Sequence, residues 1–228
     1  MALKVPDQQI VHIKKFLELP DDKIKGFLDA LAKAGPQFNV YDLSEEVSVR
    51  LEISRHLIEG IVQVLASLYR TRDVQDTPID TFLDQEVSVA LKNQGAFTEK
   101  NADAEWAKLR KFLIVALSLE RTVGTAAKAG YILTQHERIF VGARILTDVR
   151  PIFHQDVSEK PNAAVIIHML RITERDTFGH QAEKYFALDS NDIRDLKVLI
   201  DRALRKEETL KSLMKDSGVT VLHPKGFF

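Results

Sequence analysis

The apolar residues of the first 130 positions recur every three or four residues, and turn signals divide them into short segments. This spacing places apolar side chains on one face of a helix, whereas a half-buried strand would require alternation. Gly35-Pro36 ends one segment, and another is expected to run from near Asn101 to Gly124 or beyond. The pattern therefore predicts an all-helical domain over residues 1–130. Its central helix is expected to start after Ser54 and to carry Leu57, Ile58, Ile61, Val62, Leu65 and Leu68.

The hydrophobic period changes in the last third of the chain. Residues 144–153 and 163–173 are rich in β-branched and apolar side chains, which is typical of strands. A turn signal at 176–179 separates them from a third short strand over 184–188. Asp189 then offers an N-cap oxygen to a long helix.

These elements predict an α+β fold, in which a helical domain is followed by a small three-stranded antiparallel sheet with a C-terminal helix. The boundary is expected near Gly130, so that the second domain spans residues 131–228.

The middle strand carries apolar residues on both of its faces. Alternation places Val165, Ile167 and Met169 on one face, and Ile166 and Leu170 on the other. One helix covers one face, so the second face requires either the helical domain of the same chain or another subunit. We favour another subunit, because leaving three apolar side chains exposed would lose several kcal/mol of the stabilisation that their burial provides. The candidate interface residues are Val149, Val165, Ile167 and Met169.

Composition restricts the function classes. The 228 residues carry a formal charge of −1, so no overall field attracts nucleic acid or an anionic membrane. Cysteine is absent, which excludes disulfides and thiolate chemistry and fits a reducing compartment. The N-terminus lacks the apolar run of a signal peptide, and no 18-residue apolar stretch follows. A cytoplasmic location is therefore expected.

Residues with catalytic or metal-binding chemistry do not form recognisable motifs. No two of the seven histidines lie three or four residues apart, so no metal site is predicted. The glycines lack the setting of a phosphate loop, and no cofactor is predicted. His168 lies inside the apolar middle strand, where we interpret it as a histidine hydrogen-bonded to a neighbour. We expect neither a catalytic residue nor an enzymatic activity.

Residues 44–60 have the rhythm of a helix-turn-helix, with a three-residue turn and a second helix that opens with Ser54, Arg55 and His56. A recognition helix needs a polar face for phosphates and bases, whereas this one is densely apolar. We therefore interpret it as a core helix. A helix-turn-helix regulator with a C-terminal dimerisation or sensing domain remains the alternative function.

From position 145 onward, the chain resembles the COMM-domain family. The matching features are Asp148-Val149-Arg150 in the first strand, Pro161 before the apolar second strand, and Phe186-Ala187-Leu188 before an amphipathic helix. Val149 stands where the family typically has tryptophan. The resemblance implies a non-enzymatic adaptor whose C-terminal module pairs with itself or with a homologous protein. Nucleic acid is not an expected partner, and further protein partners cannot be named from the sequence.

Overall fold

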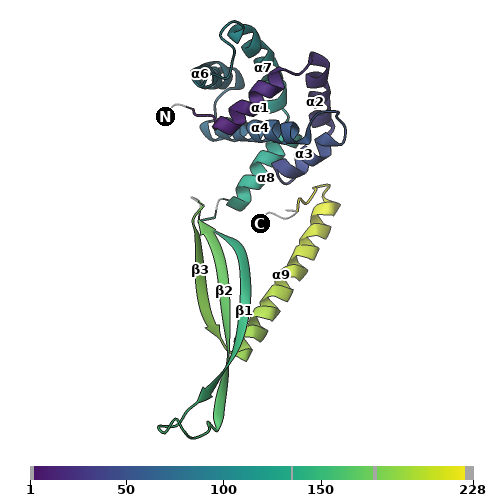
Figure 1. The fold of residues 1–228 in the computed structure, drawn as a ribbon. Coiled ribbons are helices and arrows are strands. Elements are labelled where there is room, and N and C mark those ends of the chain that lie inside the picture. Colours follow the sequence, from purple (N-terminus) through teal and green to yellow (C-terminus); the bar gives the residue numbers. More distant parts are fainter. Residues whose placement is uncertain (1–2, 135, 177–178, 224–228) are drawn as a thin grey trace. The chain divides into compact units, whose positions relative to one another are not determined.

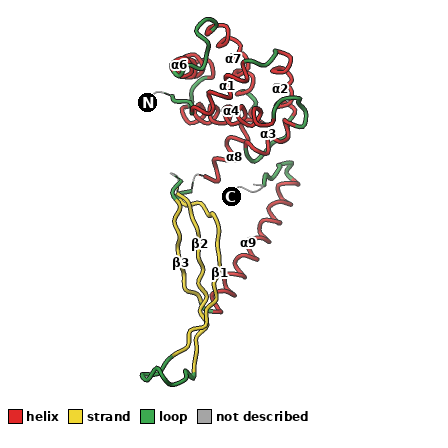
Figure 2. Tube along the Cα trace, in the orientation of Figure 1, coloured by secondary structure: helices red, strands yellow, loops and turns green. Residues whose placement is uncertain are grey.

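The chain folds into two compact units, each of which has its own secondary structure (Figure 1). The computed structural model describes residues 3–134, 136–176 and 179–223. The first unit ends at Ile132, and the second spans Leu133–Val221. The first is helical, and the second combines a three-stranded antiparallel sheet with a C-terminal helix (Figure 2). The predicted α+β fold class is confirmed.

The helical unit contains four longer helices and several short segments. A buried aliphatic and aromatic core lies between them, and α4 supplies many of its residues, including Val62 and Leu65. The elements are α1 (Asp7–Leu17), α2 (Asp21–Lys33), α3 (Val40–Ser48), α4 (Arg55–Gln75), α5 (Ile79–Thr81), η1 (Phe82–Val87), α6 (Ser88–Asn93), α7 (Ala102–Leu117), η2 (Glu120–Gly124) and α8 (Thr125–Thr134).

Local signals set the ends of these helices. The Asn39 side chain accepts hydrogen bonds from the backbone N–H groups of Tyr41 and Asp42 at the start of α3, which satisfies donors that the helix itself cannot pair. Asp76 ends α4 in the left-handed region, with φ 50°, a conformation that aspartate adopts more readily than most residues.

The expected helix from near Asn101 to Gly124 is interrupted. α7 stops at Leu117, and Glu120–Gly124 form a π-helical turn before α8 begins. Apolar spacing alone did not indicate this break.

The sheet of the second unit has the strand order β1-β2-β3, with both pairs antiparallel. β1 covers Arg138–Ile152, β2 covers Ala163–Asp176 and β3 covers Gln181–Leu188. A bulge between Phe140 and Gly142 interrupts the register near the start of β1. The predicted turn at 176–179 includes positions 177 and 178, which lie outside the described residues.

A capping box starts the last helix, α9 (Ser190–Asp216). The Asp189 carboxylate accepts hydrogen bonds from the N–H groups of Asn191 and Asp192, and the Asp192 carboxylate accepts one from the Asp189 N–H. This reciprocal arrangement satisfies donors at the helix start, as the sequence predicted for Asp189.

Candidate interaction surface

The strand register divides the sheet residues between two faces, because directly paired residues share a face. Val149 pairs with Ile166, and Leu170 lies between Ile145 on β1 and Phe186 on β3. We call this side the apolar face. Its apolar members include Ala143, Ile145, Val149, Ile166, Leu170, Ile172, Phe186 and Leu188.

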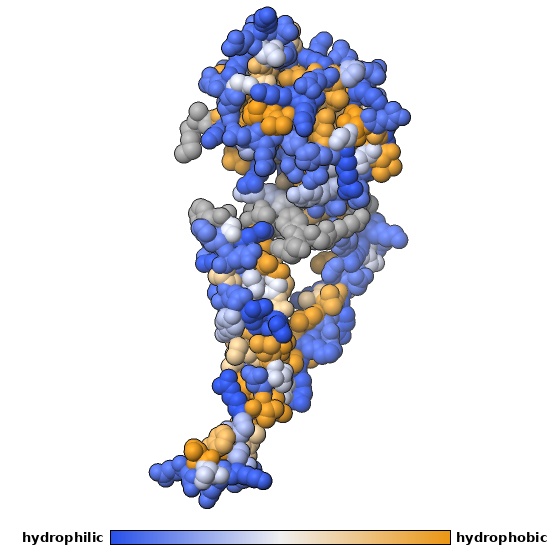
Figure 3. Space-filling model, viewed as in Figure 1, coloured by the Kyte–Doolittle hydropathy of each residue, from blue (hydrophilic) through white to orange (hydrophobic). Residues whose placement is uncertain are grey.

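The apolar face is largely open to solvent. The exposed fraction is 63% for Val149, 55% for Ile166, 50% for Ile145 and 44% for Phe186. Figure 3 shows hydrophobic residues gathered on the sheet and along α9. Large contiguous apolar surfaces mark sites of association in soluble proteins. The apolar face is therefore the strongest candidate for a contact surface.

The opposite side, the mixed face, alternates apolar and charged residues. Ile167 pairs with Asp148, and Val165 pairs with Arg150. Arg171 lies opposite Arg144, and its guanidinium is 3.2 Å from the Glu183 carboxylate. These charges remain hydrated when the face is exposed, and covering them would incur a desolvation cost.

The four residues predicted from the sequence as one interface do not share a face. Val165, Ile167 and Met169 lie on the mixed face, whereas Val149 lies on the apolar face. Alternation along β2 correctly grouped the first three. The face of Val149 depends on how β1 pairs with β2, which the alternation of a single strand does not reveal.

One polar pair interrupts the apolar face. His168 pairs with Thr147 on one side and Leu188 on the other, and its Nδ1 lies 2.9 Å from the Thr147 Oγ1. The half-buried His168 thus has the hydrogen-bonded neighbour that its position in an apolar strand predicted. The pair lies between the rows of Ile166 and Leu170, and apolar residues flank it along β2.

The C-terminal helix does not bury its own apolar residues. α9 is described over its full length, and none of its 27 residues is buried. Ile200 and Leu204 remain 58% and 57% exposed. The helix was expected from the sequence to cover one face of the sheet, and that expectation is wrong for the isolated chain. Its apolar stripe comprises Ile193, Leu196, Ile200, Leu204, Leu210 and Met214. Ile200, Leu204 and Leu210 are exposed, and the other three are half-buried.

Two histidines meet in the helical unit although they are far apart in the sequence. The ring centroids of His12 on α1 and His56 on α4 are 5.0 Å apart. Burial is the main cause that lowers the pKa of His12, and the nearby His56 and Lys15 lower it further. The His12 Nδ1 is buried without a hydrogen-bond partner among the described residues. Close packing of α1 against α4 creates this contact, which the spacing of histidines along the sequence did not reveal.

Gly60 makes the approach of α1 possible, because a Cβ atom at this position would overlap the His12 ring. We expect Gly60→Ala to lower the free energy of unfolding by about 1–3 kcal/mol, since overpacking outweighs the better helix propensity of alanine. Gly26→Ala is the matched control, because the new Cβ would make only an ordinary 3.5 Å contact with Leu51. Thermal unfolding should show a lower Tm for the first variant and an unchanged or higher Tm for the second.

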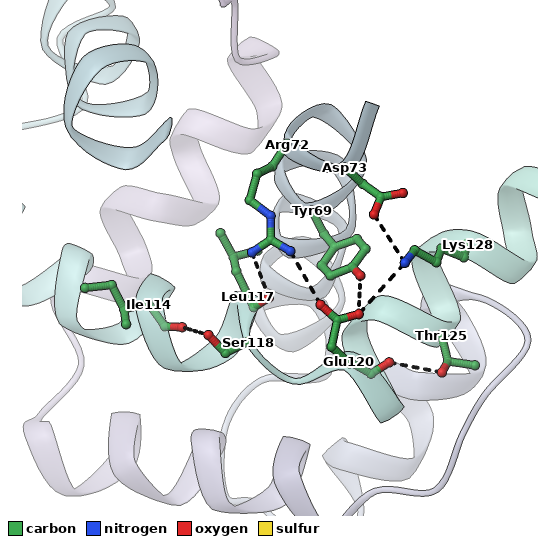
Figure 4. Close-up of polar contacts among 9 residues, drawn as sticks. All are labelled: Tyr69, Arg72, Asp73, Ile114, Leu117, Ser118, Glu120, Thr125 and Lys128. Atoms are coloured by element: carbon green, nitrogen blue, oxygen red, sulfur yellow. Dashed lines mark hydrogen bonds and ion pairs between the residues drawn. The ribbon is translucent and has the colours of Figure 1, made fainter. Parts of the chain in front are cut away.

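A polar cluster fixes the π-helical turn η2 against α4 (Figure 4). The Tyr69 hydroxyl donates a hydrogen bond to the Glu120 carboxylate. Arg72 lies 3.5 Å from the same carboxylate, and Lys128 lies 3.2 Å from Asp73. Burial is the main cause that raises the pKa of Tyr69, and its hydrogen bond to Glu120 adds to the rise. The contacts tie α4 to η2 and α8, so we assign the cluster a structural role.

Residues 44–60, whose sequence resembles a helix-turn-helix, have a different local geometry from the one expected. Six residues, 49–54, separate α3 from α4, rather than the expected three. Ile58 and Ile61 are buried in the core of the helical unit. Arg55, at the start of α4, lies 3.7 Å from Glu45 of α3. The apolar side of α4 is thus engaged in packing, as the density of its apolar residues predicted.

The described residues show no metal cluster, although they form a sizeable groove. They contain no group of three or more histidine, aspartate or glutamate side chains arranged to hold a metal ion. An open groove of about 580 Å³ between α2 and α7 is lined by apolar residues and lysines, among them Leu28, Val115 and Lys111.

No protein-family model matches the chain, and no curated protein matches it significantly. Among the helices of the described residues, none combines the length and the apolar character needed to cross a membrane.

Proposed function

We propose that this chain is a non-enzymatic adaptor that associates, through its sheet and α9, with a second copy of itself or with a homologous chain. The association surface is the apolar face together with the apolar stripe of α9. The second unit is then a COMM-like dimerisation module, as the similarity of residues from 145 onward implies. The helical unit remains available to other protein partners, and the cysteine-free sequence fits a cytoplasmic location.

One observation carries this proposal: the second unit has almost no core of its own. Among its described residues, only Ile139 and Glu174 are buried. Glu174 is held between two cations, with Arg138 at 3.4 Å and Lys184 at 3.2 Å. A three-stranded sheet needs a covered hydrophobic face to be stable in water. Within the described residues of this unit, neither face is covered well enough to bury more than these two side chains.

The free energy available from covering these residues is considerable. Complete burial of an isoleucine, leucine, valine or phenylalanine side chain stabilises by about 1.5–3 kcal/mol. Val149, Ile166, Ile145 and Phe186 are about half exposed, so covering each would contribute about 1 kcal/mol. Association must also offset lost translational and rotational freedom. The stripe of α9 supplies the additional apolar area that this cost requires.

Charge distribution favours the apolar face over the mixed face as the contact surface. The charges on the apolar face, Lys184 and Glu174 among them, lie toward one end of the sheet, and these two form an ion pair at 3.2 Å. The mixed face has Asp148, Arg150, Arg144 and Arg171 beside its apolar residues. A partner on the apolar face would therefore desolvate fewer charges.

The solution mass of the full chain tests the proposal. One chain has a mass of 25.8 kDa, and multi-angle light scattering at tens of micromolar should give about twice that value or a higher multiple. The mass should fall toward that of one chain on serial dilution, because association depends on concentration. A single-chain mass throughout this range would refute self-association. Titration with a homologous chain would then decide whether the module forms only mixed pairs.

A further inference from the structure

His168 occupies the centre of the proposed contact surface. Ile166 and Leu170 flank it on β2, Thr147 and Leu188 are its cross-strand neighbours, and each pairing is part of a continuous register. Thr147 is its hydrogen-bond partner. A second copy that covered Ile166 and Leu170 would also cover the imidazole between them. The pair Thr147–His168 would then form a polar centre inside an apolar contact.

A neutral imidazole suits that position and a charged one does not. Neutral imidazole has one donor and one acceptor nitrogen, and the Thr147 hydroxyl satisfies Nδ1 in either role. Protonation makes both nitrogens donors and adds a positive charge, which is costly to remove from water without a partner. Histidine is the side chain whose charge ordinarily changes between pH 5 and 8.

Asp189, at the start of α9, is a charged group near His168. Asp189 lies close enough for its carboxylate to interact electrostatically with His168, and the Asp189 pKa is lowered mainly by its hydrogen bonds from the backbone of Asp192 and Asn191. Arg194 acts on the same carboxylate. From β1 and β3, the paired residues are the uncharged Thr147 and Leu188. In the separated chain, a protonated His168 would therefore be stabilised by water and by a nearby carboxylate. Covering the face would remove the water.

We propose that the Thr147–His168 pair makes association through the apolar face dependent on pH, with the dimer favoured while His168 is neutral. This inference deepens the proposed function and rests on it. If covering the face disfavours proton binding, dissociation takes up protons. Association is then strongest at a pH at which the imidazole is neutral, and it weakens as pH falls through the range in which histidine ordinarily becomes charged.

The size of the effect depends on the number of imidazoles that the dimer covers. Each subunit contributes one His168. Because the cost of covering a protonated imidazole then applies twice, the Kd should rise at least about tenfold between pH 8 and pH 5.5.

The experiment measures the Kd of self-association of the full chain by sedimentation velocity at pH 8 and pH 5.5. The wild type should associate at least about tenfold more weakly at pH 5.5. His168→Gln keeps a hydrogen-bonding side chain but does not titrate, so its Kd should change by no more than about twofold. His154→Gln is the matched control, because His154 is exposed and lies outside the apolar face; it should behave as the wild type.

The outcomes separate this inference from the function on which it rests. A monomer at pH 8 overturns self-association, and with it the role of His168 in it, and leaves only pairing with a homologous chain. A dimer whose Kd is the same at both pH values, or a His168→Gln variant that keeps the full pH dependence, overturns only the role of His168. If His168→Gln no longer associates at pH 8, dilution calorimetry of the wild type decides the matter. In buffers of different ionisation enthalpy, dissociation at pH 6.5 should take up protons, and no uptake would overturn the inference.

Discussion

Replacing Ile166 by aspartate should convert the associated protein into single chains. Ile166 lies on the apolar face opposite Val149, and both are more than half exposed. The new carboxylate would stay hydrated in the separate chain, whereas association would bury it among apolar side chains without a partner. The expected increase in Kd is at least about a hundredfold, which corresponds to about 2.7 kcal/mol. Light scattering should then give the mass of one chain at tens of micromolar.

Ile167→Asp is the matched control for this substitution. The two isoleucines are adjacent on β2, so both variants have the same change in volume, charge and strand propensity. Ile167 lies on the mixed face opposite Asp148. Its variant should retain the mass of the wild type, with a modest fall in Tm because Ile167 is half-buried.

The reverse result would assign the contact to the other side of the sheet. If Ile167→Asp dissociates and Ile166→Asp does not, the contact surface is the one that contains Val165, Ile167 and Met169. Circular dichroism must show folded protein for both variants, because an obligate dimer often has no stable folded single chain. Should Ile166→Asp be unfolded, Val149→Lys tests the same face more gently, since the long lysine stem can carry its charge outward to water.

The helical unit could be predicted well from the sequence because its signal is local. Apolar residues at helical spacing, such as Ile58, Ile61 and Leu65, are buried in the structure. The strands and the cap at Asp189 could also be predicted, since β-branched runs and N-cap residues act on their own segments. The fold class follows from the order of these elements.

The features that the sequence did not reveal depend on contacts between distant segments. The face occupied by Val149 is set by the pairing of β1 with β2. The meeting of His12 with His56 depends on how α1 packs against α4. The turn at Glu120 is stabilised by Tyr69 and Arg72, which lie about 50 positions earlier in the chain. No periodicity of a single segment contains this information.

The exposure of apolar residues at the start of β2 has a different origin. The sequence correctly predicted that β2 has apolar residues on both sides, but it also predicted that α9 would cover one of them. α9 has its main contact with the sheet at β3, the strand from which it follows. The helix could cover its own sheet or the sheet of another subunit. Both roles require the same amphipathic sequence. Hydrophobic patterning therefore predicts that a surface will be buried without predicting by which chain.

The core of the helical unit should respond strongly to the loss of one aromatic ring. Phe112 of α7 is buried, and its ring centroid lies 4.4 Å from that of Phe16 and 5.9 Å from that of Phe27. Phe112→Ala removes contacts with two other helices and leaves a cavity. The expected loss in the free energy of unfolding is about 3–5 kcal/mol. Denaturant unfolding followed by the far-ultraviolet helix signal should show it as a lower midpoint.

Val115→Ala on the same helix provides the comparison, because Val115 is 47% exposed and its truncation should cost about 1 kcal/mol or less.

The Phe112→Ala variant also tests whether association depends on the second unit alone. If the contact is made by the sheet and α9, Phe112→Ala should retain the associated mass at temperatures at which its helical unit is still folded. A variant that becomes a single chain while remaining folded would show that the helical unit takes part in the contact. In that case the Phe16–Phe27–Phe112 cluster would support the association surface as well as its own core.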